Sequence, residues 1–378
     1  MKPELFTREN IHTLTFPRTE DGNYARRYLM PMVLDGVEKY IRNAHNTQLM
    51  IAKVDDVIIP ITLSDFHPDN TYTVSPYSHY ISYGGYEEVK HLNDPQAEAL
   101  IKMLLRPLAC FFRFAEFDKV AYINNYLLST NLYPQVNSDQ LSALSKALPG
   151  WFPDRAIVFR SVGGRKNPHI LNTLKANGCD LVLSRQVWFM DPAESVVSKS
   201  YKEDRRVLRN HKYEIVNGGD FSNEDLMRSV DLYNMLYLEK YSYFNPQFTF
   251  EFMKHARDEK TLHMLALKRD GRMDGVMGYF IRNCAMTLPL LGYDTSLPKQ
   301  EGLYRLLTQL IIQEGLRHNL LIHSSSGVGN FKKARGGKSA IEYNAVYASH
   351  LPVRRQVPWK LIKAISRYAI PYFQKMDF

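Results

Sequence analysis

The part of the sequence that most restricts the fold is a succession of four elements near its C-terminal end. Residues 285–293 are apolar and predict a strand, residues 294–300 a loop, residues 301–318 a long amphipathic helix, and residues 320–324 a second strand. A helix between two strands covers one face of a sheet in α/β proteins. Its first amides have no partner within the helix, so the loop before it is suited to bind an anion.

The length of the chain and the order of its elements predict two domains. Its 378 residues exceed the usual size of a single domain, and strands alternate with helices on both sides of an Asp-Pro pair at 191–192. We predict an N-terminal domain at 1–190, a C-terminal domain at 191–350 and a basic amphipathic tail at 351–378. The predicted fold class is α/β (α+β), with a mixed, largely antiparallel sheet flanked by helices in each domain.

Hydrophobic periodicity predicts the individual elements. In the N-terminal domain we expect helices at 26–43, 95–114, 138–148 and 170–177, and strands within 48–63 and at 121–128, 154–160 and 181–190. In the C-terminal domain we also expect helices at 223–241 and 248–258, a short helix near Phe331, and strands at 261–268, 275–282 and 341–348. We interpret residues 202–212 as a basic stretch that leads into the first of these helices.

Charge and cysteine content narrow the classes of function. The formal net charge is +9, and the tail at 351–378 holds six Lys and Arg residues against one acidic residue. This balance suits an acidic partner such as tRNA, an anionic membrane or an acyl carrier protein, whereas no helix resembles a DNA reader. The cysteines at 110, 179 and 284 lack metal-ligand spacing, so we expect them to be reduced and buried, and we expect no metal site. No apolar leader or membrane span is apparent, which predicts a cytoplasmic protein or one peripheral at the membrane.

Three short segments resemble known transferases. The loop KQEGLY at 299–304 resembles the [Gln/Arg]-x-x-Gly-x-[Gly/Ala] loop of the GNAT acyltransferases, with Lys and Tyr at its two ends. The segment GVGNFKKARGG at 327–337 is similar to the Phe-Lys-x-x-aromatic-Gly segment of the Fem-type and BioF2-like transferases, with Arg335 in the aromatic position. The segments SPY at 75–77 and YGGY at 83–86 resemble the Ser-Pro-Tyr and Tyr-Gly-Gly segment of the same group.

The resemblance covers residues 25–350 and implies two tandem GNAT-like domains that transfer an acyl or aminoacyl group to an amine. In such folds the strand before the long helix pairs with the donor's pantetheine arm, and the loop holds the donor's phosphates. These roles fall on Leu291, Gly292, Tyr293, Lys299, Gln300, Gly302 and Lys332, of which Lys332 is equally compatible with binding an acceptor carboxylate or with simple solvation. Tyr77 and Tyr83 would line the acceptor wall, or pack as ordinary aromatic residues.

Two residues are candidates for the general base that deprotonates the amine. His323 belongs to the strand after the long helix and has an ordinary pKa near neutrality, which suits proton transfer. Asp294 ends the strand before the loop. The structural alternatives are a hydrogen-bonded histidine and an aspartate that caps a turn.

Three functions remain open at this point. The first is an N-acyltransferase that uses acyl-CoA or an acyl-carrier-protein thioester as cosubstrate, with no tightly bound cofactor and no covalent enzyme intermediate. The second is aminoacyl transfer from charged tRNA, as in Fem-type enzymes, which the positive charge would suit. The third is a catalytically silent binding module, favoured by Tyr304, whose side chain could block a pyrophosphate.

Overall fold

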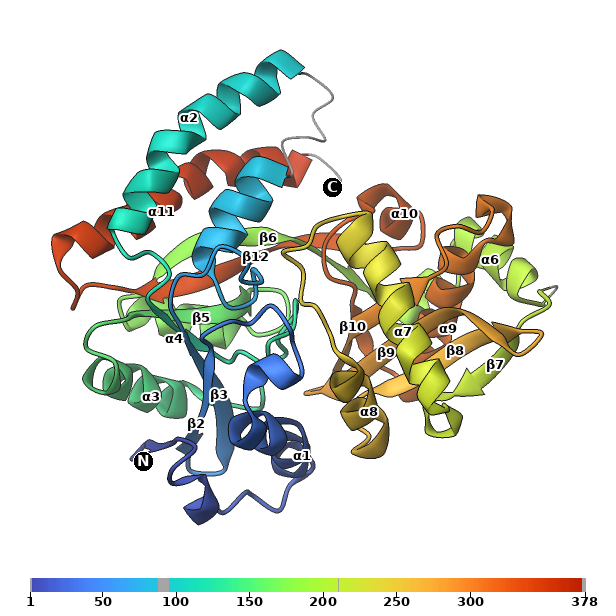
Figure 1. Ribbon diagram of the computed structural model, residues 1–378, viewed down its shortest axis with the longest axis horizontal. Coiled ribbons are helices and arrows are strands. Elements are labelled where there is room, and N and C mark those ends of the chain that lie inside the picture. The colour runs from blue at the N-terminus through green and yellow to red at the C-terminus, as the bar shows by residue number, and fades with distance from the viewer. Residues whose placement is uncertain (1, 88–94, 210, 376–378) are drawn as a thin grey trace. The chain divides into compact units, whose positions relative to one another are not determined.

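The computed structural model describes residues 2–87, 95–209 and 211–375 (Figure 1). The chain forms two compact units. Unit 1 consists of the chain up to Ser184, Ser242–Gln247 and Tyr343–Tyr368, and unit 2 consists of Arg185–Tyr241, Phe248–Glu342 and the residues from Ala369 onward. Strands β6 (Asp180–Met190) and β12 (Lys338–Tyr347) contribute residues to both units.

The elements of unit 1 follow the predicted alternation of strands and helices. Its strands are β1 (Glu4–Phe6), β2 (Gln48–Val54), β3 (Val57–Ser64), β4 (Val120–Ile123) and β5 (Ala156–Gly163). Its helices are α1 (Glu20–Asp35), α2 (Pro95–Phe114), α3 (Ser138–Trp151), α4 (Pro168–Ala176) and most of α11 (Val353–Lys375), with short helical segments η1 (Ile11–Thr13), η2 (Val37–Lys39) and η3 (Ser78–Glu87). Strands β1 to β4 pair antiparallel in sequence order, and β4 pairs parallel with β5.

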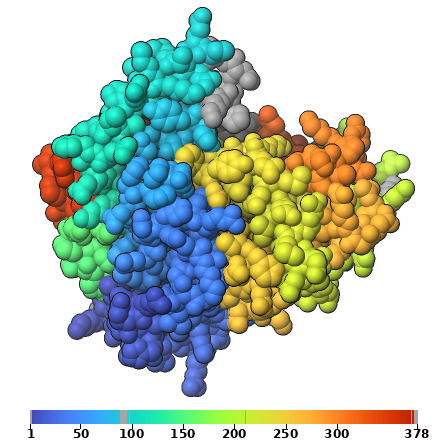
Figure 2. Space-filling view, viewed as in Figure 1, coloured from blue at the N-terminus to red at the C-terminus, as the bar shows by residue number. Residues whose placement is uncertain are grey.

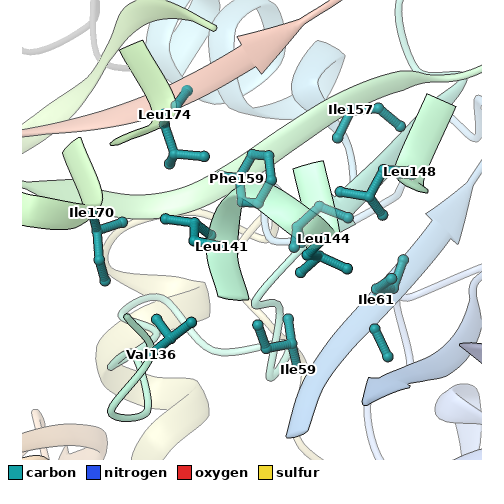
Figure 3. Close-up of a cluster of buried hydrophobic side chains, with 14 of the residues drawn as sticks. Ile59, Ile61, Val136, Leu141, Leu144, Leu148, Ile157, Phe159, Ile170 and Leu174 are labelled. Carbon is teal, nitrogen blue, oxygen red and sulfur yellow. The ribbon is translucent and has the colours of Figure 1, made fainter. Parts of the chain in front are cut away.

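The core of unit 1 forms where α3 and α4 lie on the sheet. Strand β3 is buried along its whole length; one face is apolar, and the other also carries the buried hydroxyls of Thr62 and Ser64. Figure 3 shows leucines of α3 and α4 pointing toward Ile59, Ile61 and Phe159 of the strands. A capping box between Asn137 and Gln140 fixes the start of α3.

Unit 2 has the same kind of organisation. Its own strands are β7 (Glu214–Asn217), β8 (His263–Arg269), β9 (Arg272–Arg282), β10 (Ala285–Tyr293) and β11 (Leu321–His323). Its helices are α5 (Pro192–Ser195), α6 (Lys199–Arg209), α7 (Asn223–Asn234), α8 (Phe250–Asp258), α9 (Leu303–His318) and α10 (Gly329–Lys333), with η5 (Gly218–Asp220), η6 (Met235–Glu239) and η7 (Lys299–Glu301). The strand order is β6-β11-β10-β9-β8-β7, and every pair is antiparallel except β10 with β11.

Two helices cover opposite faces of this sheet, α7 in front and α9 behind in Figure 1. A Cβ atom on Gly292 of β10 would lie 2.6 Å from the backbone of α7, so a glycine is required where that helix crosses the strand. On the next strand, a Cβ atom on Gly275 would meet Leu307 of α9 at 3.4 Å. The sheet is therefore enclosed on both sides, and only its edges and strand ends remain for ligands.

Several elements differ from the prediction, each for a local reason. Helix α1 begins earlier than residue 26, because Thr19 accepts a hydrogen bond from the Gly22 amide and caps it. Strand β4 ends at Ile123, because Asn124 adopts a left-handed conformation with φ of 58°. The basic stretch at 202–212 is largely the helix α6, which was not predicted, and residue 210 lies outside the described part.

Two further expectations concerned exposure. Of the three reduced cysteines only Cys179 is buried, whereas Cys110 and Cys284 are exposed, so the expectation of buried cysteines is wrong for those two. The tail at 351–378 is a helix whose Trp359 and Ile362 join the core of unit 1, and its last three residues lie outside the described part.

Helix α2, teal in Figure 2, exposes Leu100, Met103 and Leu104. Among the described helices, none combines the length and the apolar character needed to cross a bilayer.

The change from unit 1 to unit 2 after Ser184 precedes the predicted boundary at residue 190. The tail contributes mostly to unit 1, and Ser242–Gln247 returns to unit 1 from within the predicted C-terminal domain. Such returns leave no mark in composition, whereas the predicted boundary rested on the strand at 181–190 and the Asp-Pro pair that follows it.

Candidate functional site

The central feature of unit 2 is the place where two parallel strands part. Strands β10 and β11 pair only from Ala285 with Leu321 to Thr287 with His323. Beyond this point the chain of β11 stays beside β6, since the Ser324 amide donates to the Trp188 carbonyl (2.8 Å) and the Trp188 amide to the Ser325 carbonyl (2.9 Å). Strand β10 continues to Tyr293, with an irregular register against β9 after Thr287.

The predicted donor-pairing residues Leu291, Gly292 and Tyr293 lie on the part of β10 that β11 does not reach. Leu291 and Tyr293 are half-buried, and both belong to the apolar cluster on the α9 side of the sheet. This arrangement leaves one side of a strand available for pairing with an extended ligand, as a sheet edge does. Beyond Thr287 and His323 the two strands of unit 2 are therefore no longer paired with each other.

Helix α9 begins beside this part of the chain. Gly302 adopts a left-handed conformation (φ 67°, ψ 23°), the helix starts at Leu303, and among the described residues no side chain caps it. Lys299 and Gln300 are exposed in the turn that precedes Gly302. The first amides of α9 lack partners within the helix, so the predicted anion loop has the backbone form that such a site needs.

The charge of Glu301 and the bulk of Tyr304 both have partners within the protein. The carboxylate of Glu301 pairs with Arg269 (2.9 Å between Oε2 and Nη1), so its negative charge is already balanced. The ring of Tyr304 packs 4.8 Å from the Phe331 ring and 6.2 Å from the Tyr293 ring, measured between centroids. Burial raises the pKa of Tyr304, so the phenol stays neutral. Tyr304 thus forms part of an aromatic contact between α9 and α10.

A cluster of buried polar groups fixes the end of β11. His323 is 5% exposed, and its Nε2 lies 3.5 Å from Oε2 of Glu342, which is 3% exposed. The guanidinium of Arg185 donates to Glu342 Oε1 (2.8 Å) and to the Ser325 hydroxyl (2.8 Å). Because burying an unpaired charge is costly, these partners depend on one another.

The cluster determines the protonation state of its members. Burial raises the pKa of Glu342, but the charge of Arg185 and the contact with His323 outweigh it and lower the pKa to about 2. Burial lowers the pKa of His323, so the imidazole is neutral near pH 7. Its Nδ1 accepts a hydrogen bond from the Ser325 amide (3.2 Å), while Nε2 faces the Glu342 carboxylate. Both ring nitrogens of His323 are therefore engaged.

Lys332 is buried rather than exposed. Its ammonium donates to the carbonyls of Ser324 (2.6 Å) and Ser326 (2.9 Å), the turn that follows His323. Burial, with a smaller contribution from the positive charge of Arg185, lowers the pKa of Lys332 to about 7. In this structure the ammonium holds a backbone turn, so the alternative of simple solvation is wrong.

Other residues of the segment at 327–337 also have structural partners. Arg335 lies 3.4 Å from the Phe331 ring centroid and donates to Asp204 of α6 (2.6 Å). A Cβ atom on residue 337 would lie 2.7 Å from the Lys332 carbonyl oxygen, which is too close, so a glycine is required there. The motif thus fixes α10 against α6 and the end of β11.

The structure does not bring Asp294 and His323 together. Thr287 is paired with His323, and Asp294 follows seven residues later along β10, which corresponds to about 20 Å or more at ~3.3 Å per residue. Asp294 is buried and pairs with Arg228 (2.6 Å) and with Arg272. Burial raises its pKa, but hydrogen bonds from Ser296 and the Arg228 guanidinium outweigh this and lower it. The two candidate bases therefore cannot act on one proton.

Tyr77 and Tyr83 belong to unit 1, whereas the other predicted site residues belong to unit 2. The Tyr77 amide and the Ser75 hydroxyl both donate to buried Asp118 (2.7 and 2.8 Å). Burial raises the pKa of Asp118 to about 7, although these hydrogen bonds oppose the rise. The Tyr83 ring packs 5.5 Å from that of Tyr72. The Ser-Pro-Tyr segment thus holds the buried carboxyl group of Asp118 through two hydrogen bonds.

The sequence reasoning missed the charged partners of His323. Arg185 lies in the middle of β6, just before the apolar run at 187–190, and Glu342 lies between Ile341 and Tyr343 in β12. A charged residue beside apolar ones inside a strand was the available signal, because buried charges are rare unless they are paired. Within the described residues, no group of three His, Cys, Asp or Glu side chains is placed to hold a metal ion.

Comparisons with known proteins concern the fold. No protein-family model and no curated protein matches the sequence. The structure of FemX superposes with a TM-score of 0.53 at 9% identity, over 96% of this chain and 100% of FemX. L-PGS from Bacillus licheniformis gives 0.43 at 15% identity over 59% and 76% of the two chains, and a tandem GNAT protein from the clavulanic acid biosynthesis pathway gives 0.38 at 11% over 93% and 99%. The likeness to FemX covers nearly the whole chain, and it confirms the predicted α/β (α+β) fold class and, at the level of the fold, the resemblance to Fem-type transferases.

Proposed function

We propose that unit 2 is an N-acyltransferase site. An acyl donor, either acyl-CoA or an acyl-carrier-protein thioester, lies along the uncovered part of β10 with its phosphate or polar end at the start of α9. The observation that carries this proposal is the parting of β10 and β11 at Thr287 and His323, next to a helix start that no described side chain caps. Backbone groups of β10, the amides after Gly302 and the exposed Lys299 supply the contacts.

The reaction needs no covalent bond to the protein. The amine nitrogen attacks the thioester carbonyl carbon, the carbon–sulfur bond of the tetrahedral intermediate breaks, and the sulfur leaves as a thiol after taking up a proton. The nitrogen loses its proton to water. Holding the amine and the thioester in contact supplies a large part of the rate acceleration in such transfers.

We assign positioning roles to both candidate bases. His323 is held by the Ser325 amide and Glu342, and Asp294 by Arg228 and Arg272, so neither has a free lone pair aimed at a ligand. The variants His323→Gln and Asp294→Asn should lower kcat while the pH dependence of kcat/KM keeps its shape. Loss of the limb at lower pH in His323→Gln alone would reassign His323 as the general base.

The test of the activity is release of free thiol. Purified protein is offered a series of acyl-CoA and acyl-carrier-protein thioesters with a pool of amines, and thiol is followed with a colour reagent. We expect release that depends on both the donor and an amine. If folded protein, verified by circular dichroism, releases no thiol from any donor, the proposal fails.

A second candidate is aminoacyl transfer from charged tRNA, which the net charge of +9 favours. It requires transfer that ribonuclease abolishes and that weakens steeply with salt. The same amine pool with a mixture of charged tRNAs tests it directly. Transfer from tRNA without thiol release would replace the first candidate.

Tyr304 separates an active site from a silent binding module. Its ring contacts those of Tyr293 and Phe331, so Tyr304→Ala removes aromatic packing at the start of α9. In a site shaped by this ring we expect donor affinity to fall by severalfold, measured by calorimetric titration. A large gain in affinity would indicate that Tyr304 blocks a degenerate pocket.

A further inference from the structure

Unit 2 contains a cavity of about 750 Å³ between α6 and α9, which pack against each other. Four cations of α6 line it, together with Gln313 and the apolar side chains Val196, Tyr201 and Leu316. The cations are Lys202, Arg205, Arg206 and Arg209. Their spacing of three, four and seven residues places them on one face of the helix, over a length of about 10 Å.

These four cations have no acidic partner among the described residues. The two carboxylates of α6 are engaged elsewhere, because Glu203 faces Lys199 (4.0 Å) and Asp204 pairs with Arg305 and Arg335 (2.6 Å each). All four cationic residues are exposed. Like charges so close together repel, which favours an anion between them.

We propose that this cavity binds an organic polyphosphate of nucleotide size. Two or more adjacent phosphates lie along the four cations, and arginine forks match phosphate oxygens in two hydrogen bonds each. The organic part rests on Val196, Tyr201 and Leu316, and Gln313 offers a donor and an acceptor. A volume of this size is typical of small-molecule pockets.

Part of the cavity lies away from the proposed donor site, although α6 also borders that site: a Cβ atom on Gly302 would lie 3.9 Å from the Val207 side chain. Gln313 lies ten residues along α9 from Leu303, which is about 15 Å at ~1.5 Å per residue. The proposal therefore goes beyond the transferase function and does not depend on it. The cavity has a volume suited to a small ligand, and Tyr201 of its lining is buried rather than protruding as a side chain that enters a bilayer would be.

The test is calorimetric titration of the full chain with ATP and with tripolyphosphate, at about 50 and 200 mM salt. Neither probe carries an acyl group, so the outcome is independent of transfer activity. We expect binding of both probes, with affinity falling as salt rises. In the double variant Arg205→Gln, Arg206→Gln, affinity should fall at least about tenfold, the loss expected from removing charge-assisted hydrogen bonds.

Two control variants locate the binding. Lys199→Gln changes a cation of the same helix that does not line the cavity, and Lys299→Gln changes the proposed donor loop. Both should leave the affinity unchanged. All variants alter exposed side chains, and melting curves verify that they fold. Binding that survives the double variant, or that Lys299→Gln abolishes, overturns the proposal.

Two further probes distinguish the source of the phosphates. A short RNA that binds and is displaced by tripolyphosphate supports recognition of a phosphate chain in this cavity. Binding of RNA or of phosphatidylglycerol vesicles through the two arginines, without any binding of ATP or tripolyphosphate, overturns the assignment to a small polyphosphate.

Discussion

Each unit contains a strand, a helix and a second strand that pairs parallel with the first. The two copies differ in how the chain continues beyond the paired residues. In unit 1, β4 pairs with β5 from Val120 with Ala156 to Ile123 with Phe159, and α3 lies between them in sequence. In unit 2, β10 pairs with β11 in the same parallel sense, and α9 lies between them. Both pairs end after three or four residues. Each unit therefore has an opening, the place where its two parallel strands part.

Unit 1 closes this opening with its own chain. The residues after β4 are buried, and Asn125 donates to the Thr62 hydroxyl (2.7 Å) and to the Thr73 carbonyl (2.9 Å). Arg160 donates to the Asn125 side chain (2.6 Å) from β5. In unit 2 the corresponding strand continues past the end of β11, and its residues alternate between half-buried (Leu288, Leu291, Tyr293) and buried (Pro289, Leu290, Gly292).

The helices that follow the first strand of each pair, α3 and α9, also differ in how their N-terminal amides are capped. The amides of α3 are satisfied by the capping box of Asn137 and Gln140, whereas α9 begins at Gly302 without a capping side chain in the described residues. One unit caps this helix start with its own side chains, whereas in the other the described side chains leave it uncapped. The comparison supports placing the donor in unit 2.

The largest expected effect concerns the charged cluster of unit 2. Glu342→Gln leaves the guanidinium of Arg185 buried without its carboxylate, so the free energy of unfolding should fall by about 3–5 kcal/mol. Urea unfolding measures it. As a control, Glu194→Gln breaks the exposed pair with Lys338 and should cost less than about 1 kcal/mol.

The same carboxylate sets a pH dependence. Because the pKa of Glu342 is lowered to about 2, its contribution to stability is present above its ordinary pKa of 4.5 and is lost as the pH falls through about 2. In Glu342→Gln, stability should fall less steeply with acidification than in the native protein. Parallel curves for the two proteins would contradict the charged pairing.

The hydrogen-bonded cluster around Asn125 in unit 1 should be less sensitive to a single substitution. Asn125→Ala removes hydrogen bonds to Thr62 and Thr73 and one acceptor of Arg160, and we expect a loss of about 1–3 kcal/mol in urea unfolding. Acyl transfer per folded molecule should not change, because the closed opening of unit 1 holds no donor. Loss of donor affinity in this variant would break the distinction between the units.

The smallest effects come from a matched pair at the two helix starts. Asn137→Ala removes a cap, and Gly302→Ala places a Cβ atom at a φ of 67°, so each should cost about 1 kcal/mol of stability. Calorimetric titration should show weaker donor binding only for Gly302→Ala. Equal donor affinity in both variants would remove the start of α9 from the site.

Local patterns in the sequence were enough to predict many elements. The bounds of α2 and β10 agree with the prediction, since each is a long periodic run with clear ends. Helix α6 was missed because its charged face dominates the composition, while only Tyr201, Asp204 and Leu208 face inward. The tandem fold followed from the order of elements and from the resemblance.

The site was less accessible to prediction. Arg185, His323 and Glu342 come from three strands that are distant in sequence, and their pairing depends on strand register. Conversely, Asp294 and His323 both stand near strand ends in the sequence, yet the length of β10 separates them. The roles proposed for Lys299, Gln300 and Gly302 remain predictions that donor binding will test.

The repeated passage of the chain between the two units has a practical consequence for dissecting the protein. The chain passes from one unit to the other after Ser184, Tyr241, Gln247, Glu342 and Tyr368. A protease that cuts at one of these places leaves the two units joined by the remaining connections. Neither half can be expressed as one uninterrupted fragment, so each must be studied by substitution within the intact polypeptide.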